Sequence, residues 1–118
     1  MKSPGRNATL SICALALWPA SGHASDADWQ KVQGDAVRTA LSGRILQYED
    51  AWQDFRASGR TLYNAGSESW GYWRVEGDQY CSQWPPSDLW ACYDLEASGD
   101  KLRFVGDEGD TTEATYAD

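Results

Sequence analysis

The stretch that decides the fold is Trp70-Gly-Tyr-Trp-Arg-Val-Glu-Gly-Asp-Gln-Tyr-Cys-Ser-Gln-Trp84. On both sides of Gly77-Asp78, large apolar side chains alternate with polar ones at a period of two, as in a β-strand with one buried face. A Gly-Asp pair between two such runs is typical of a tight turn. The stretch therefore predicts a hairpin of two antiparallel strands, over residues 71–76 and 79–83.

The same pattern extends outward from this hairpin, with turn residues such as Ser58-Gly59 and Ser98-Gly99-Asp100 between the runs. The predicted strands cover residues 44–48, 52–56, 60–64, 71–76, 79–83, 90–97, 101–105 and 111–116. The first three alternate poorly, so their existence is predicted but their faces are not. Regular short strands separated by turns predict an all-β, antiparallel up-and-down meander of seven or eight strands, curled into a barrel or half-barrel.

One short helix is predicted before the first of these strands. Val37, Ala40 and Leu41 form a single apolar stripe at helical spacing, Asp35 is placed to cap the N-terminus, and Gly43 suits the left-handed residue that ends a helix. We expect a helix over residues 36–42, packed on the open side or end of the sheet. Residues 25–34 are polar and predict no more than a turn or two of helix.

The predicted core combines the helix stripe with the apolar faces of the strands. Its members are Val37, Leu41, Leu62, Trp73, Val75, Tyr80, Trp84, Tyr93, Leu95, Leu102, Phe104 and Tyr116.

Residues 1–24 have the three regions of a signal peptide: basic residues, an apolar run over residues 10–18, and a small-residue cleavage site. Gly22 and Ala24 occupy the −3 and −1 positions of a cut before Ser25. The apolar run is too short for the roughly 20 residues that span a bilayer. The sequence therefore predicts a protein cleaved after Ala24 and delivered to the periplasm or secreted, with a single small β domain over residues 25–118.

Two cysteines, Cys81 and Cys92, remain after this cleavage. In the predicted register both fall on the polar faces of neighbouring strands, opposite Tyr80 and Tyr93. Since exported proteins meet an oxidising compartment, we expect a Cys81–Cys92 disulfide.

Loss of the leader also removes His23, the only histidine of the chain. The remaining protein has no imidazole for a Ser-His-Asp or Cys-His nucleophile or for a zinc or copper site. No catalytic residue, metal ligand or cofactor is predicted. The formal net charge of −8 argues against nucleic-acid partners, and no later segment is apolar enough for stable membrane insertion.

The region around the decisive stretch resembles a family of short exported alphaproteobacterial proteins of unknown function. The shared features are a G-x-W strand at Gly71, a Gly-Asp turn, a Tyr-Cys strand, a Trp-Pro loop at Trp84 and a Cys-Tyr strand at Cys92. The resemblance covers roughly residues 41–116 and implies a secreted β fold without an activity. Gly71-Tyr72-Trp73 also resembles the lipocalin G-x-W signature, which implies a lipocalin-like or calycin-like barrel.

Three aromatic residues, Trp70, Tyr72 and Trp90, are placed at strand ends or on the polar face. Such rings form stacking platforms for sugars or other planar ligands, so these three are the predicted ligand-binding residues. The alternative is that the loops of Trp70 and Trp90 fold over a barrel end or cover the disulfide.

Carboxylates offer two weaker candidates. Residues 107–113 gather four of them around a turn, an arrangement that suits calcium but lacks EF-hand spacing, so a solvated hairpin turn is the better interpretation. Glu49, Asp50, Asp54, Glu68 and Glu76 are available for acid–base chemistry, yet no spacing marks a pair.

The function predicted from these features is non-catalytic binding. The domain would bind a small apolar or sugar-like ligand in the barrel mouth, or another envelope protein. Two alternatives remain open at this point: a small carboxylate-dependent hydrolase, and a protein inhibitor whose loops insert into a partner.

The leader and the disulfide are both tested by the mass of the protein recovered from the periplasm. Denaturing mass spectrometry is expected to give a chain that begins at Ser25 and lacks two hydrogens. A mass that still includes residues 1–24 would contradict the prediction of export.

Overall fold

The computed structural model describes residues 28–118, so the predicted signal peptide lies outside the described residues. Nine strands and one helix are present there. Their bounds are β1 (Gln30–Val32), α1 (Asp35–Leu41), β2 (Arg44–Gln47), β3 (Trp52–Phe55), β4 (Arg60–Asn64), β5 (Glu68–Glu76), β6 (Gln79–Gln83), β7 (Trp90–Ser98), β8 (Lys101–Val105) and β9 (Thr111–Tyr116). Among these residues, no helix has the length and hydrophobicity of a membrane span.

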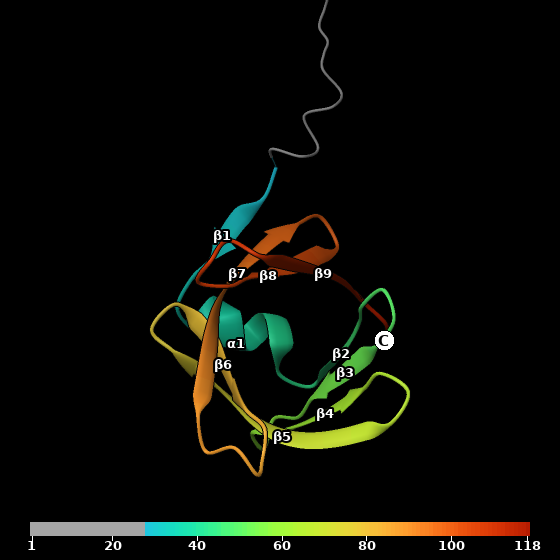
Figure 1. Cartoon of the computed structure of the whole chain (residues 1–118). Coiled ribbons are helices and arrows are strands. Elements are labelled where there is room, and N and C mark those ends of the chain that lie inside the picture. Colours follow the sequence, from blue (N-terminus) through green and yellow to red (C-terminus); the bar gives the residue numbers. More distant parts are fainter. Residues whose placement is uncertain (1–27) are drawn as a thin grey trace, which may run out of the picture.

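Strands β2 to β9 form an antiparallel up-and-down barrel (Figure 1). Each strand pairs with its neighbours in the chain, and β9 returns to pair with β2, which closes the sheet. The predicted meander is therefore confirmed as a closed eight-stranded barrel with one additional strand, β1. The helix α1 lies inside the ring of strands.

The predicted strands agree closely with the observed ones. Residues 60–64, 79–83, 101–105 and 111–116 match the observed bounds, while β2 and β3 are each one residue shorter and β7 one longer. The main difference is β5, which begins at Glu68 and includes Trp70. Pairing with all of β4 extends this strand beyond its alternating part.

Strand β1 was not predicted, and the expectation of helix within residues 25–34 was wrong over its three residues. Its partner is β7, through Gln30↔Ala97, Lys31↔Glu96 and Val32↔Leu95. Because β6 begins only at Gln79, opposite Asp94, the rest of this edge of β7 is free to pair with β1. The pairing depends on the tertiary structure and could not be predicted from the polar sequence of residues 30–32.

The helix α1 begins one residue earlier than predicted. Gly34, with φ 58°, occupies the N-cap position, and no side chain caps the helix, so the assignment of Asp35 as the cap was wrong. Asp35 instead lies in the first turn of the helix, where the negative charge of its carboxylate interacts favourably with the positive end of the helix dipole. The backbone N–H of Gly34 donates to Asp78 Oδ1 at 2.8 Å, which ties the start of α1 to the β5–β6 turn.

The core joins the inner side of the helix to the inner face of the barrel. Its buried members are Val37, Leu41, Leu46, Phe55, Trp73, Tyr80, Leu95, Leu102, Phe104 and Ala114, with Val75, Tyr93 and Tyr116 partly buried against them. Leu46, Phe55 and Ala114 were missing from the predicted core. Leu46 and Phe55 lie on β2 and β3, where inward polar residues such as Gln53 obscure the alternation, whereas Ala114 is a small residue between polar neighbours on β9.

Leu62 is buried as predicted, but it does not belong to the inner core cluster. Its neighbour Thr61 faces the barrel interior, where its hydroxyl accepts a hydrogen bond from Gln53. Leu62 therefore faces outward, next to its register partner Trp70 on β5, and is buried on the outer surface. Trp84, also expected in the core, is only half-buried and lies at one end of the barrel.

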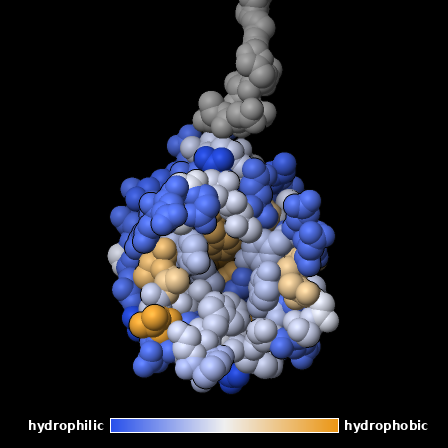
Figure 2. Space-filling model, in the orientation of Figure 1, coloured by the Kyte–Doolittle hydropathy of each residue, from blue (hydrophilic) through white to orange (hydrophobic). Residues whose placement is uncertain are grey.

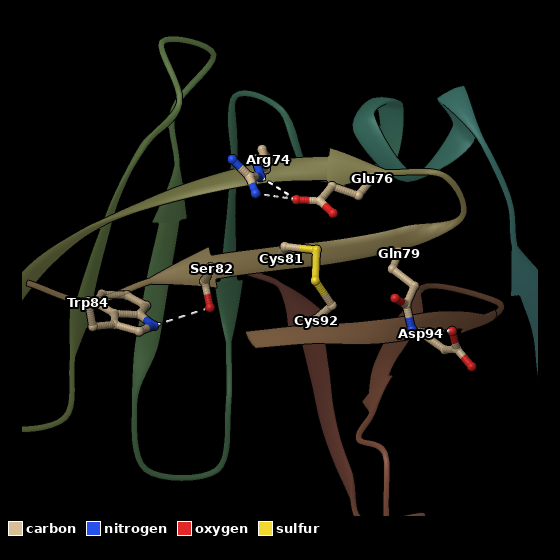
Figure 3. The surroundings of a disulfide bond; sticks show 8 residues. All are labelled: Arg74, Glu76, Gln79, Cys81, Ser82, Trp84, Cys92 and Asp94. Carbon is tan, nitrogen blue, oxygen red and sulfur yellow. Dashed lines mark hydrogen bonds and ion pairs between the residues drawn. A yellow bond between two sulfur atoms is a disulfide. The ribbon is translucent and has the colours of Figure 1, made fainter. Parts of the chain in front are cut away.

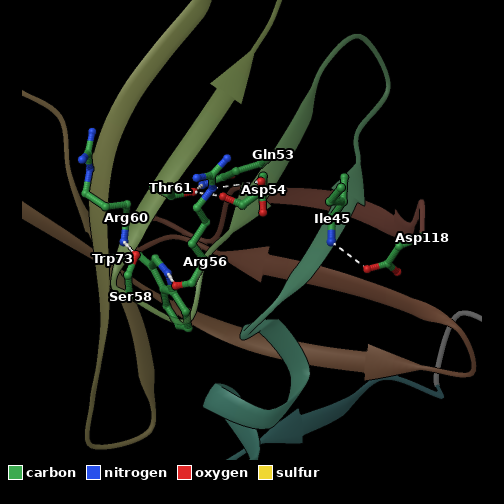
Figure 4. Close-up of polar contacts among 9 residues, drawn as sticks. All are labelled: Ile45, Gln53, Asp54, Arg56, Ser58, Arg60, Thr61, Trp73 and Asp118. Carbon is green, nitrogen blue, oxygen red and sulfur yellow. Dashed lines mark hydrogen bonds and ion pairs between the residues drawn. The ribbon is translucent and has the colours of Figure 1, made fainter.

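The seam between β2 and β9 is short, with only Leu46↔Tyr116 and Gln47↔Thr115 in register. The C-terminal residues reinforce it: the backbone N–H of Ile45 donates to Asp118 Oδ2 at 3.1 Å (Figure 4), and Arg44 forms an ion pair with Asp118 at 3.0 Å. These two contacts hold the pKa of Asp118 below its usual range. The seam therefore rests on side chains as well as on the strand ladder.

The disulfide prediction is confirmed. Cys81 and Cys92 are direct register partners on β6 and β7, and their sulfurs are bonded at 2.05 Å. Figure 3 shows the bridge between the two strands, with Ser82 farther along β6 and Trp84 just beyond its end. Cys81 is fully buried even though it lies on the outward face of its strand.

Replacing both cysteines by alanine is expected to lower the free energy of unfolding by about 3 kcal/mol, the chain-entropy value for such a short loop. Chemical denaturation of the Cys81→Ala/Cys92→Ala variant and of the reduced wild type checks this. Equal unfolding midpoints for oxidised and reduced wild type would contradict it.

Candidate functional site

The two ends of the barrel differ. One end is filled by α1, while the other opens into a hollow of about 800 Å³. The hollow is bordered by the β2–β3 and β4–β5 turns, the β6–β7 loop and the β8–β9 turn. In Figure 2 it is seen in the middle of the molecule, with hydrophobic residues at depth and residues of intermediate hydropathy around it.

Seven aromatic side chains line the wall of the hollow. Six of them make a continuous series in which neighbouring ring centroids lie 5.1–6.2 Å apart, in the order Trp84, Tyr63, Tyr48, Phe104, Tyr80 and Tyr93. Tilted and edge-on arrangements at these distances stabilise aromatic pairs. The series comes from five different strands or their ends, so only the closed barrel assembles it.

Gly71 makes room for one of these rings. A Cβ atom at position 71 would lie 2.5 Å from Cε3 of Trp84 and 2.6 Å from the carbonyl oxygen of Gln83. The Trp84 indole N–H donates to Ser82 Oγ at 3.2 Å. The glycine of the G-x-W motif thus allows the Trp84 ring to lie against β5 at the wall of the hollow.

The floor of the hollow is a buried polar network centred on Gln53. Its Oε1 accepts a hydrogen bond from the Tyr48 hydroxyl at 2.7 Å, and its Nε2 donates to Thr61 Oγ1 at 3.0 Å and to Tyr80 Oη at 3.3 Å. Thr61 then donates to the carbonyl oxygen of Asp54 at 2.8 Å. Figure 4 shows Gln53 and Thr61 beside each other on neighbouring strands.

Burial raises the pKa of both Tyr48 and Tyr80 above the ordinary tyrosine value. Both phenols are therefore neutral hydrogen-bonding groups at any physiological pH. The floor contributes hydroxyl and amide groups to the hollow but no charge.

The charged groups of the hollow are all acidic. Glu49 and Asp50 come from the β2–β3 turn, and Asp110 from the β8–β9 turn. The lining, which lies wholly within residues 28–118, contains no lysine, arginine or histidine. The open end of the barrel therefore carries negative charge above an aromatic wall.

The three predicted ligand-binding residues do not lie together in this hollow. Of them, Trp70 alone borders it. Tyr72 and Trp90 both pair with Gln83, which places them in one row on the outer face of β5, β6 and β7. Tyr72 is 42% exposed and Trp70 39%, so both rings remain accessible.

Arginines cover these outer rings. The guanidinium of Arg60 lies 4.8 Å from the Trp70 ring centroid and 5.4 Å from that of Tyr72, and Arg74 lies 3.8 Å from that of Trp90. Such cation–π contacts occupy ring faces that a planar ligand would need. The outer row is thus better described as a set of packed Arg–aromatic pairs than as an open stacking platform.

The carboxylate candidates are dispersed. Asp54 and Glu76 pair with Arg56 and Arg74, respectively. Within residues 28–118, the metal-type cluster is Glu76 with Cys81 and Cys92, whose sulfurs are bonded to each other. The four carboxylates of residues 107–113 do not form such a cluster in the described part of the chain, in keeping with a hairpin turn.

No known protein family, curated protein or solved structure matches this chain. The geometry of the barrel is therefore the basis for assigning a function.

Sequence reasoning missed Tyr48, Gln53 and Tyr63 as site residues, although it placed a ligand site in the barrel mouth. These residues face inward on the strands with poor alternation. Gln53 interrupts the alternation of apolar and polar residues in its strand. That interruption was the one feature of the sequence that could have indicated a polar floor.

Replacing Tyr48 by phenylalanine tests the buried network. The variant leaves the buried Gln53 Oε1 without its donor, so the free energy of unfolding at pH 7 is expected to fall by about 1–3 kcal/mol. Tyr72→Phe, on the outer face, is the control and is expected to have little effect.

The pH dependence of this difference is a second readout. Because burial raises the folded-state pKa of Tyr48, wild-type stability is lost as pH rises above the unfolded tyrosine pKa of about 10. The variant lacks this loss, so the difference in the free energy of unfolding between wild type and variant, measured by chemical denaturation, should become smaller above that pH. A difference that is constant up to the pH of unfolding would contradict the assignment.

Proposed function

We propose that this protein is a non-catalytic binding protein that holds a small molecule with a planar or apolar body in the open end of its barrel. The observation that carries the proposal is the hollow of about 800 Å³ lined by a continuous series of aromatic side chains. A volume of roughly 300–1,000 Å³ is usual for small-ligand sites.

The wall and floor suit binding rather than catalysis. Rings provide apolar contact area, while the Tyr and Gln groups beneath them provide a few fixed polar contacts. Among residues 28–118, the lining offers no histidine, cysteine or lysine as a nucleophile or base near neutral pH.

The disulfide supports assignment to the periplasm or the extracellular space, where such bonds persist. A lipocalin-like role, in which an eight-stranded barrel carries one ligand, agrees with the number of strands. The resemblance of the G-x-W motif adds to this part of the proposal.

The experiment uses N-phenyl-1-naphthylamine, a neutral planar probe whose fluorescence rises in apolar surroundings. We expect saturable binding with one probe per barrel. Tyr63→Leu, which removes a ring from the wall, should weaken the affinity by about threefold to tenfold.

Tyr72→Leu is the matched control, since Tyr72 is on the outer face of the adjacent strand. It should leave probe affinity unchanged. Equal weakening by both substitutions, or the absence of saturable binding to the wild type, would refute a site inside the barrel.

A further inference from the structure

We infer that the hollow selects organic cations: its ligand joins a planar or apolar body to an ammonium or similar positive group. This inference rests on the proposed function and specifies the ligand class for the same site. Its basis is the combination of an aromatic wall, an acidic rim and a floor of neutral polar groups.

The rim carboxylates have no ion-pair partner among the described residues. They belong to Glu49, Asp50 and Asp110, which line the hollow. Carboxylates around a low-dielectric cavity concentrate the field there, which attracts cations and repels anions.

The cations of the described chain are committed elsewhere. Five of them form ion pairs away from the hollow, namely Lys31, Arg44, Arg56, Arg74 and Arg103. Arg38 lies over the ring of Trp73, outside the hollow. Arg60 lies over the rings of Tyr72, on the outer face, and of Trp70, which borders the hollow, and Arg60 itself is absent from the lining. Lys101 lines an adjacent groove of about 630 Å³ between β2 and β9 and is absent from the lining of the hollow.

The wall complements the same ligand class. The π faces of Tyr and Trp attract cations, and the attraction is stronger when the cation is partly desolvated. Trp84, Tyr63 and Tyr48 supply rings beneath the rim, so a positive group near the opening would be close to both ring faces and carboxylates.

The floor offers little to an anion. Both hydrogen-bond donors of the Gln53 amide are directed at Thr61 and Tyr80, and the hydroxyl of Tyr48 donates to Gln53. A carboxylate or sulfate at this depth would lose its hydration and would meet only neutral donors such as the Tyr80 hydroxyl, since the lining holds no lysine, arginine or histidine. The structure thus disfavours fatty-acid-like ligands.

A matched series of naphthalene compounds tests the inference by displacement of N-phenyl-1-naphthylamine from the wild-type protein. The series is 1-naphthylmethylammonium, 1-naphthalenemethanol and 1-naphthoate, which share the planar body and differ in charge. The cation is expected to bind about tenfold more tightly than the alcohol, and the anion more weakly than both.

Two charge-neutralised variants separate the rim from the net charge. Glu49→Gln/Asp50→Asn/Asp110→Asn should remove most of the preference for the cation and leave alcohol affinity unchanged. Asp28→Asn/Asp35→Asn/Asp100→Asn removes the same charge from exposed residues outside the lining and away from the turns that border the hollow, and should retain the preference. If the rim variant does not fold, raised salt on the wild type should reduce the preference instead.

The outcomes distinguish the two proposals. If the alcohol and the probe bind but the cation has no advantage, the cation inference fails and the proposed function stands. If the preference is lost equally in both variants, net charge and not the rim is responsible, and the inference also fails. If nothing in the series binds, the proposed function fails and this inference fails with it.

Discussion

Closure of the sheet is the constraint on which the rest of this structure depends. An eight-stranded barrel has an interior just wide enough for side chains or one small ligand, and that interior must be filled by something. Here closure relies on a seam of two register pairs between β2 and β9, supported by Asp118. Without it, α1 would have no enclosed space to occupy, and the aromatic series would be split between Tyr48 and Phe104, which come from opposite sides of the seam.

The hollow follows from a mismatch of lengths. A seven-residue helix is about 10 Å long, whereas the nine-residue strands β5 and β7 extend about 30 Å. The helix therefore fills one end of the barrel, where Val37 and Leu41 meet Phe55 and Trp73. The other end is lined by rings and by the hydrogen bonds of Gln53, which satisfy buried polar groups that would otherwise destabilise the fold.

Much of the fold could be read from the sequence, because local pattern and tertiary environment agree over β5 to β9. The alternation around Trp73 and Tyr80 identified the inner and outer faces of these strands and the disulfide. It could do so because a shift of the strand register by one residue would move every side chain to the opposite face of the sheet. The pattern failed where the inner face is polar, as at Gln53 and Thr61, and where pairing is supplied by a distant strand, as for β1. The candidate site was predicted least well. The pattern did not assign the inner and outer faces of the strands near Tyr48 and Tyr63, so these two residues were not chosen. Trp70, Tyr72 and Trp90 were chosen instead because they are aromatic residues outside the predicted core.

The sequence by itself determined the class of fold, the order of the strands, the turn glycines and the pairing of Cys81 with Cys92, since each depends on residues close in the chain or on a period of two. Only the tertiary structure decided that the sheet closes, that one end remains open and that carboxylates without an ion-pair partner in residues 28–118 lie around it. These features depend on strand tilt, on the length of α1 and on contacts between residues far apart, such as Arg44 with Asp118. Local sequence patterns contain no information about contacts between distant residues, so the site could be identified only in the folded barrel.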